Sequence, residues 1–142
     1  MQRVDGQESV RVSEGMRRLA DGRMLAMSEL PVSDDYDQFA VLVPAFDADE
    51  RARVEAAVDA LLDRGCLAFV CVGPEAEVLE DGIDAIIEAR GAFEVVTTSH
   101  AGVADAVEFF ALCAGGRAAN LVALVDGHPE VVAALEAITT AA

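Results

Sequence analysis

Between Phe39 and Ile138, short apolar runs alternate four times with segments whose apolar residues recur at helical spacing. The four runs are Phe39–Val43, Leu67–Val72, Phe93–Thr98 and Asn120–Val125. Runs of this length predict strands, and continuously apolar ones are typical of strands buried on both faces of a sheet. Because strands and helices alternate strictly, the connections are expected to be right-handed crossovers. The sequence therefore predicts an α/β fold, a three-layer sandwich with a four-stranded parallel sheet.

The polarity of the third run bears on the order of the strands. This run carries Glu94, Thr97 and Thr98, so it is the most polar of the four and is predicted to lie at an edge. An edge position favours the Rossmann-like order 3-2-1-4 over the flavodoxin-like order 2-1-3-4. Both orders remain open at this point.

Residues 1–37 lack this alternation and predict an N-terminal arm that precedes the α/β domain of residues 38–142. Ser13 is a candidate cap for a short helix in the arm. Five apolar residues recur there at helical spacing: Met16, Leu19, Ala20, Met24 and Met27. Since methionine adapts to irregular surfaces, this helix is predicted to pack on the domain as a flap.

The amino-acid composition limits which residue types can form the core and which classes of partner the chain can bind. The 142 residues suit one domain, and with 54 % hydrophobic but only 5 % aromatic residues the core must be mainly aliphatic. The formal net charge is -16, and all ten basic residues are arginine. A field of this sign repels phosphate backbones and anionic membranes, so we expect neither nucleic acid nor membrane as a partner.

The net charge also leads to a prediction about stability. Repulsion among the carboxylates opposes the compact state, and added salt screens it, because the Debye length falls to about 3 Å at one molar. We expect the midpoint of thermal unfolding at neutral pH to rise with sodium chloride up to about one molar. A midpoint that stays flat or falls over this range would contradict the prediction.

The three cysteines, Cys66, Cys71 and Cys113, lie inside apolar runs. An odd count without paired spacing predicts buried free thiols in a reducing compartment. No run of about 18 apolar residues is present to cross a bilayer, and the first ten residues have no apolar signal-peptide core. We therefore expect a cytoplasmic protein.

Polar residues follow the predicted strands, at their carboxyl ends, where ligands bind in open α/β sheets. Five of them are candidates for a catalytic site: Asp47, Ser99, His100, Asp126 and His128. They include the residue types of a hydrolytic triad, and imidazole suits proton transfer near neutral pH. However, Ser99 lacks the G-x-S-x-G turn that exposes a nucleophile. The favoured interpretation makes Ser99 and His128 helix caps and His100 a residue of the rim.

The segment Asp47-Ala48-Asp49 resembles the DxD motif of haloacid-dehalogenase-type phosphatases. The resemblance implies that Asp47 is a nucleophile and that the two aspartates help to hold magnesium. That chemistry also requires a lysine, and the chain contains none. Asp47 followed by Glu50 fits a capping box at the start of the next helix better.

Glycine-rich phosphate-binding motifs do not follow any predicted strand. Neither GxGxxG nor GxxxxGKS/T occurs, so the usual backbone cradles for nucleotides are missing. A metal site of His100, His128 and either Asp126 or Asp47 would require the third and fourth strands to bring these residues together. We expect neither a cofactor nor a metal.

The run Thr97-Thr98-Ser99-His100, the helix end Glu108-Phe109-Phe110 and the strand sequence VLVP resemble a group of small Rossmann-like bacterial domains without assigned function. The resemblance covers roughly residues 36–138. It implies the fold alone and no catalytic residue.

The leading interpretation is a soluble, non-enzymatic α/β module that binds a protein partner or a small ligand. The alternative is a small hydrolase or transferase with a polar site at the carboxyl ends of the strands.

On the third helix, Phe109 and Leu112 lie about 100° from the stripe that faces the sheet. A large aromatic residue beside a leucine on an acidic surface predicts the centre of a homodimer interface.

Overall fold

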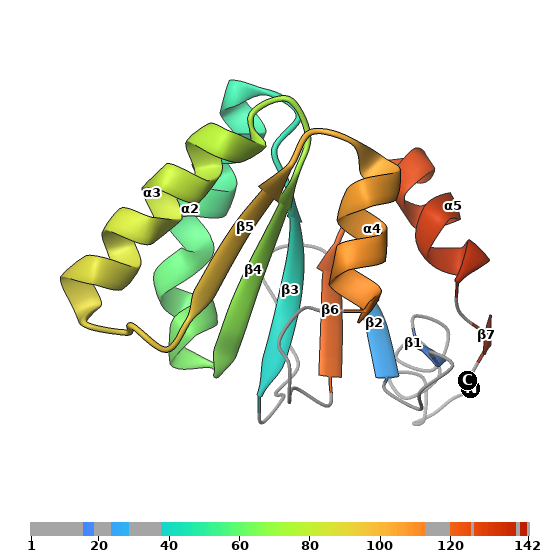
Figure 1. Cartoon of the computed structure of the whole chain (residues 1–142), viewed down its shortest axis with the longest axis horizontal. Coiled ribbons are helices and arrows are strands. Elements are labelled where there is room, and N and C mark those ends of the chain that lie inside the picture. The colour runs from blue at the N-terminus through green and yellow to red at the C-terminus, as the bar shows by residue number, and fades with distance from the viewer. Residues whose placement is uncertain are drawn as a thin grey trace, which may run out of the picture.

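The computed structural model describes residues 16–18, 24–28, 38–112, 120–125, 127–138 and 140–141. Its elements, in chain order, are β1 (Met16–Arg18), β2 (Met24–Ser28), β3 (Phe39–Pro44), α2 (Ala48–Asp63), β4 (Cys66–Val72), α3 (Ala76–Arg90), β5 (Val96–His100), α4 (Val103–Leu112), β6 (Asn120–Leu124), α5 (Pro129–Ala137) and β7 (Thr140–Ala141). The described strands form one sheet in the order β5-β4-β3-β6-β2-β1-β7 (Figure 1).

The four predicted strands are β3, β4, β5 and β6, and all neighbours among them pair in parallel. Their spatial order, β5-β4-β3-β6, is the predicted order 3-2-1-4. The central strand β3 is buried throughout, whereas the polar strand β5 lies at the edge, with Val96 56 % exposed. The predicted parallel sheet and the choice of edge strand are therefore confirmed.

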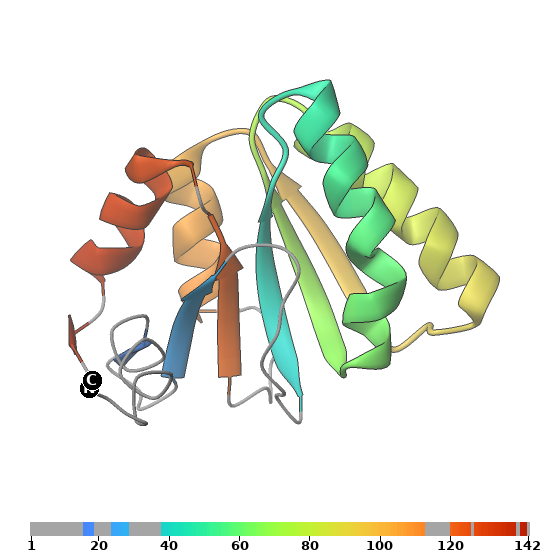
Figure 2. The same cartoon turned by 180° about the vertical axis from the view of Figure 1, so that it is seen from behind.

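Among the described helices, α2 and α3 cover one face of the sheet and α4 and α5 cover the other, which gives three layers (Figure 2). Alternate residues of a strand point to opposite faces, so β3 contributes to both layers. Its Val41 and Val43 pack with α2 and α3, whereas Ala40 and Leu42 pack with α4 and α5. None of the described helices is long and apolar enough to span a membrane.

The prediction of a short helix in the arm is wrong for those residues of the arm that the structure describes. Met16 lies in β1, and Met24 and Met27 lie in β2, which pairs in parallel with β6 and antiparallel with β1. The run MLAM satisfies helical spacing, but four consecutive apolar residues also suit a buried strand. Pairing with β6 outweighs the weak local preference for helix. The other residues named for the helix lie outside the described part of the chain.

The third strand begins later than predicted. Gly91 ends α3 in the left-handed conformation (φ 70°), and a turn follows in which the Val95 N–H donates to the carbonyl of Ala92 at 3.1 Å. Phe93 lies in this turn and is 73 % exposed, so it is not part of β5. Ser99 and His100 consequently belong to the strand instead of following it.

Candidate functional site

The strands β3 and β6 are neighbours whose following helices lie on opposite faces of the sheet. Helix α2 leaves β3 toward one face, and α5 leaves β6 toward the other (Figures 1 and 2). In open α/β sheets, ligands bind outside the carboxyl ends of the strands at such a switch point. The residues that follow β3 and β6 therefore define the candidate site.

Asp47 caps α2, as predicted from its spacing to Glu50. Its backbone is extended, and its Oδ1 accepts the backbone N–H of Glu50 at 2.8 Å. Glu50 reaches back in turn, and its Oε1 accepts the N–H of Phe46 at 2.9 Å. These two bonds satisfy donors at the start of the helix and fix the Glu50 side chain beside the end of β3.

The second oxygen of Glu50 binds His128, which follows β6. Glu50 Oε2 and His128 Nε2 lie 2.6 Å apart, and the two side chains are only 12 % and 15 % exposed. The His128 ring also stacks on Phe46, with ring centroids 4.2 Å apart and an interplanar angle of 25°. Three side chains from both sides of the switch point therefore form one partly buried cluster, the Glu50–His128 cluster.

His128 occupies the cap position of α5, as predicted, but its side chain makes no capping bond. The first helical residue, Pro129, has no N–H to be satisfied. The N–H groups of Val131 and Val132 bond to the backbone carbonyl of His128. The imidazole is thus free to turn toward Glu50, and its Nδ1 has no hydrogen-bond partner among the described residues.

The other histidine, His100, uses both ring nitrogens within its own neighbourhood. Its Nδ1 lies 2.8 Å from Asp105 Oδ2 on α4, and its Nε2 lies 3.2 Å from Thr98 Oγ1. The ring also contacts Phe109 at a centroid distance of 5.1 Å. A neutral imidazole satisfies both bonds by donating to Asp105 and accepting from Thr98. His100 therefore joins β5 to α4 and leaves no ring nitrogen for a ligand.

Ser99 points to the face of the sheet opposite His100. Its hydroxyl donates to Glu80 Oε1 on α3 at 2.7 Å, so the predicted helix-cap role is wrong. The reason is the later start of β5, which places Ser99 inside the strand. Because neighbouring strand residues alternate between faces, Ser99 and His100 do not act together as nucleophile and base.

The described candidates do not converge on a triad or a metal. Asp47 caps a helix, His100 binds Asp105, and His128 binds Glu50. Asp126 lies outside the described residues. Across the described part of the chain, no group of three or more His, Cys, Asp or Glu side chains is placed to hold a metal ion.

Gly73 brings the loop after β4 against the loop after β3. Its φ is +125°, and a Cβ at this position would lie 2.5 Å from the carbonyl oxygen of Ala45, which accepts the N–H of Glu75 at 2.8 Å. The Glu75 carboxylate accepts Arg51 Nε at 3.1 Å, and Arg51 also lies 3.4 Å from Glu55. Two carboxylates therefore neutralise the arginine beside this rim.

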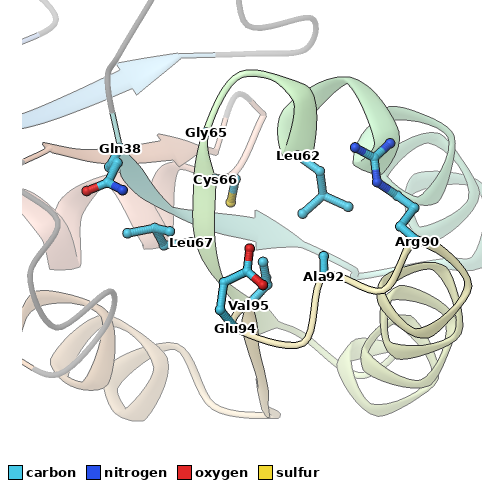
Figure 3. Close-up of a pocket in the computed structure, with 9 residues that line it drawn as sticks. All are labelled: Gln38, Leu62, Gly65, Cys66, Leu67, Arg90, Ala92, Glu94 and Val95. Carbon is cyan, nitrogen blue, oxygen red and sulfur yellow. The ribbon is translucent and has the colours of Figure 1, made fainter.

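A pocket of about 290 Å³ lies at the end of the sheet opposite the candidate site, beside the amino ends of β3 and β4 (Figure 3). Leu62, Leu67 and Val95 provide apolar lining, and the thiol of Cys66 lies at its wall. Arg90, at the rim, is held by two carboxylates of α2. None of the four candidate residues that the structure describes lies here.

The thiols of Cys66 and Cys71 are buried and free, as predicted, whereas Cys113 lies outside the described residues. Burial raises the pKa of Cys66 from 9.0 to about 12, and burial, followed by the charges of Glu80 and Asp84, raises the pKa of Cys71. Both thiols are therefore protonated in the fold at pH values that ionise them in the unfolded chain.

This difference predicts how the two thiols contribute to the free energy of unfolding. Their contribution does not change with pH below about pH 8. Between pH 9 and about 12 it lowers the free energy of unfolding by roughly 1.4 kcal/mol per pH unit for each thiol. The absence of lysine and the single tyrosine leave few other groups to titrate there. Urea unfolding at pH 8, 9 and 10 measures the slope. The substitution Cys66→Ala must reduce it, and an unchanged slope would contradict the prediction.

Neither Glu50 nor Phe46 is among the five candidate residues predicted from the sequence. Glu50 was assigned to a capping box alone, and that role accounts for only one of its two carboxylate oxygens. Its partner His128 lies 78 positions away. A carboxylate at a helix start next to the switch point was the one available signal, and it is too common to single out a site.

Fold and site together define an α/β domain with a carboxylate-bound histidine at the switch point of a parallel sheet. The chain belongs to the family described as Domain of unknown function (DUF7684), whose model matches residues 18–137. No curated protein and no solved structure matches it. The prediction of an uncharacterised family is confirmed to this extent.

Proposed function

We propose that this chain is a non-enzymatic module that binds a small molecule between the carboxyl ends of β3 and β6. The observation that carries the proposal is the Glu50–His128 bond of 2.6 Å at the switch point. Glu50 holds the imidazole by Nε2, and the bond leaves Nδ1 available to a ligand. The stacked ring of Phe46 fixes the plane of the imidazole. The order 3-2-1-4 supports a Rossmann-like placement of the ligand.

Charge indicates which ligands fit this place. Asp47, Asp49 and Glu50 lie at the start of α2, and the nearby Arg51 is bound to Glu75. A phosphorylated ligand would meet these carboxylates and a net charge of -16, and among the described residues no free cation lies beside it. We therefore propose a neutral or cationic ligand that hydrogen-bonds to His128.

The experiment is a thermal-shift and NMR screen with a defined panel of adenosine, nicotinamide, arginine and spermidine, with AMP and NAD as anionic counterparts. We expect a neutral or cationic compound to raise the midpoint of the wild type and to shift the ring signals of His128. The variant His128→Gln loses both responses, whereas the matched control His100→Gln keeps them. Equal binding by His128→Gln, or binding of the phosphorylated compounds alone, would overturn the proposal.

A hydrolase or transferase is the second candidate, and one observation favours it. An imidazole oriented by a carboxylate is the arrangement of a general base in hydrolytic sites. The predicted nucleophile Ser99 does not accompany it, because its hydroxyl is bonded to Glu80 on α3. Turnover of ester or phosphoester substrates that is lost in His128→Gln and retained in His100→Gln would establish the enzyme in place of the binding module.

Self-association through α4 also remains a proposal. Leu112 is 71 % exposed, whereas Phe109 is partly buried against the core and the His100 ring, so Leu112 is the better probe. Sedimentation at tens of micromolar would show a dimer for the wild type and a monomer for Leu112→Asp. A monomeric wild type would end this proposal.

The free thiols of Cys66 and Cys71 support the proposed cytoplasmic location.

A further inference from the structure

Strand β5 forms one edge of the sheet, and no described strand pairs with its outer side (Figure 1). Val96 is 56 % exposed, and the other four residues are partly exposed. Edge strands are usually protected from pairing by lysine, proline or a bulge. The sequence VTTSH contains neither residue, and its register with β4 is continuous from Val96 to His100. β5 is therefore an unprotected edge.

The backbone groups at the open side of β5 belong to Thr97 and Ser99. The carbonyl of His100 accepts the N–H of Gly73 at 3.0 Å, so the backbone of His100 points toward β4. Successive residues in a parallel sheet direct their N–H and C=O groups to opposite neighbours. Thr97 and Ser99 consequently present theirs to the open side, where an added strand would bond.

One flank of α3 carries a row of carboxylates along β5. These are Glu77, Glu80, Asp84 and Glu88, spaced by three or four residues and so lying on one side of the helix. The bond from Ser99 to Glu80 shows that this flank faces β5. The opposite flank faces α2, since a Cβ at Gly82 would meet Glu55.

On the other face of the sheet, α4 flanks β5 with acidic and apolar side chains. Asp105 binds His100 and is 74 % exposed, and Glu108 is exposed one turn further on. Phe109 contacts the His100 ring, and Leu112 is exposed. Side chains at alternate positions of an added strand would thus meet carboxylates on one face and a partly apolar surface on the other.

Basic residues are nearly absent from this part of the chain. Arg90 is the only arginine or lysine between Gly65 and Leu112. Its guanidinium binds Asp63 at 2.7 Å and Asp59 at 3.1 Å on α2, on the far side of α3 from β5. Apart from Arg90, the charged side chains of the described segments that flank β5 are therefore acidic, and charge complementarity selects a basic partner.

We propose that β5 accepts an extended segment of a partner protein as an additional strand, and that arginine or lysine alternates with apolar residues in this segment. The basic side chains lie along the carboxylate row of α3, and the apolar ones lie against Val96 and Leu112. A second copy of this chain fits less well, because it would bring a second acidic row and a charge of -16 to the same edge.

The probe is a short blocked peptide of alternating arginine and valine, measured by fluorescence anisotropy. A peptide of the same composition with its arginines and valines in separate blocks tests strand alternation, and a glutamate–valine peptide tests charge. We expect the alternating basic peptide to bind at least about tenfold more tightly than either control. At saturation, the amides of Thr97 and Ser99 become protected from hydrogen exchange.

Two variants locate the site. The triple substitution Glu77→Gln, Asp84→Asn and Glu88→Gln is expected to weaken binding about tenfold. A control with the same change in charge, placed on other helices, keeps the affinity within about twofold. This control is Asp49→Asn, Asp63→Asn and Glu130→Gln. Thr97→Pro removes an outward N–H without removing a bond to β4, so binding is lost while the fold persists.

Equal binding of the alternating peptide and of the peptide with its arginines and valines in separate blocks would overturn the proposal, since it would show attraction by charge alone. Unprotected Thr97 and Ser99 amides at saturation would do the same. A wild-type dimer that Thr97→Pro dissociates would assign the edge to a second copy instead. Tight binding of the glutamate–valine peptide would exclude a basic partner.

Discussion

Replacement of Gly73 by alanine is expected to destabilise the protein by about 3 kcal/mol or more. The residue has φ +125°, a conformation that side-chain-bearing residues rarely adopt. The added Cβ would lie 2.5 Å from the carbonyl oxygen and 2.9 Å from the carbonyl carbon of Ala45. These are backbone atoms at the end of the central strand, so neither can move without disturbing the sheet.

Gly102 provides the matched control, because a Cβ at that position meets nothing within 4 Å. Gly102→Ala is expected to change the free energy of unfolding by less than about 1 kcal/mol. Urea unfolding followed by circular dichroism measures both variants. Similar losses for Gly73→Ala and Gly102→Ala would show that the close approach to Ala45 does not matter.

Leu25→Ala is the second substitution with a large expected effect, a loss of about 2 to 5 kcal/mol. Leu25 is fully buried in β2, in the cluster that contains Phe110 of α4 and Leu135 of α5. Alanine leaves a cavity beneath these helices that they fill only in part. The result bears on whether residues 24–28 are an appended arm or part of the core.

Val78→Ala is the control for Leu25→Ala, since Val78 is 47 % exposed on α3. Its expected effect is within about 0.5 kcal/mol. Equilibrium unfolding in urea and the thermal midpoint are the measurements. A loss below about 1 kcal/mol for Leu25→Ala would indicate that β2 can detach while the four predicted strands remain folded.

The central fold was predictable because its signals are local. The aliphatic runs of β3, β4 and β6 are typical of buried strands, and Gly91 in the left-handed conformation ends α3, as glycine commonly does after a helix. The polarity of Glu94, Thr97 and Thr98 predicted an edge strand, because polar side chains are tolerated where one side of a strand is open. Strand order followed from that one inference.

The contribution of β2 was not predictable from local pattern. Met24 pairs with Asn120, near the other end of the sequence, and no short-range signal reports such a pairing. The run MLAMS is compatible with helix and strand alike, and only the unpaired side of β6 decides between them. The start of β5 was misplaced for a related reason, because Phe93 is apolar yet lies in the turn after α3.

The candidate site was predictable only as a location. The sequence places Asp47 and His128 after neighbouring strands, but the cluster depends on Glu50 bonding to Phe46 and His128 at once. Ser99 and His100 were each candidates on the assumption that they follow a strand. Inside β5 they face opposite layers, and each takes a partner from a different helix.

The parallel pairing of β2 with β6 has a consequence for synthesis on the ribosome. The pairs β3–β4 and β4–β5 join neighbouring segments and can form as soon as these emerge, whereas β2 must wait for β6, the last of the long strands to be made. Until then β2 can pair only with β1, and its other side stays open to chaperones. This late step carries a large loop-closure cost, so joining β2 to β6 is expected to limit the rate of folding.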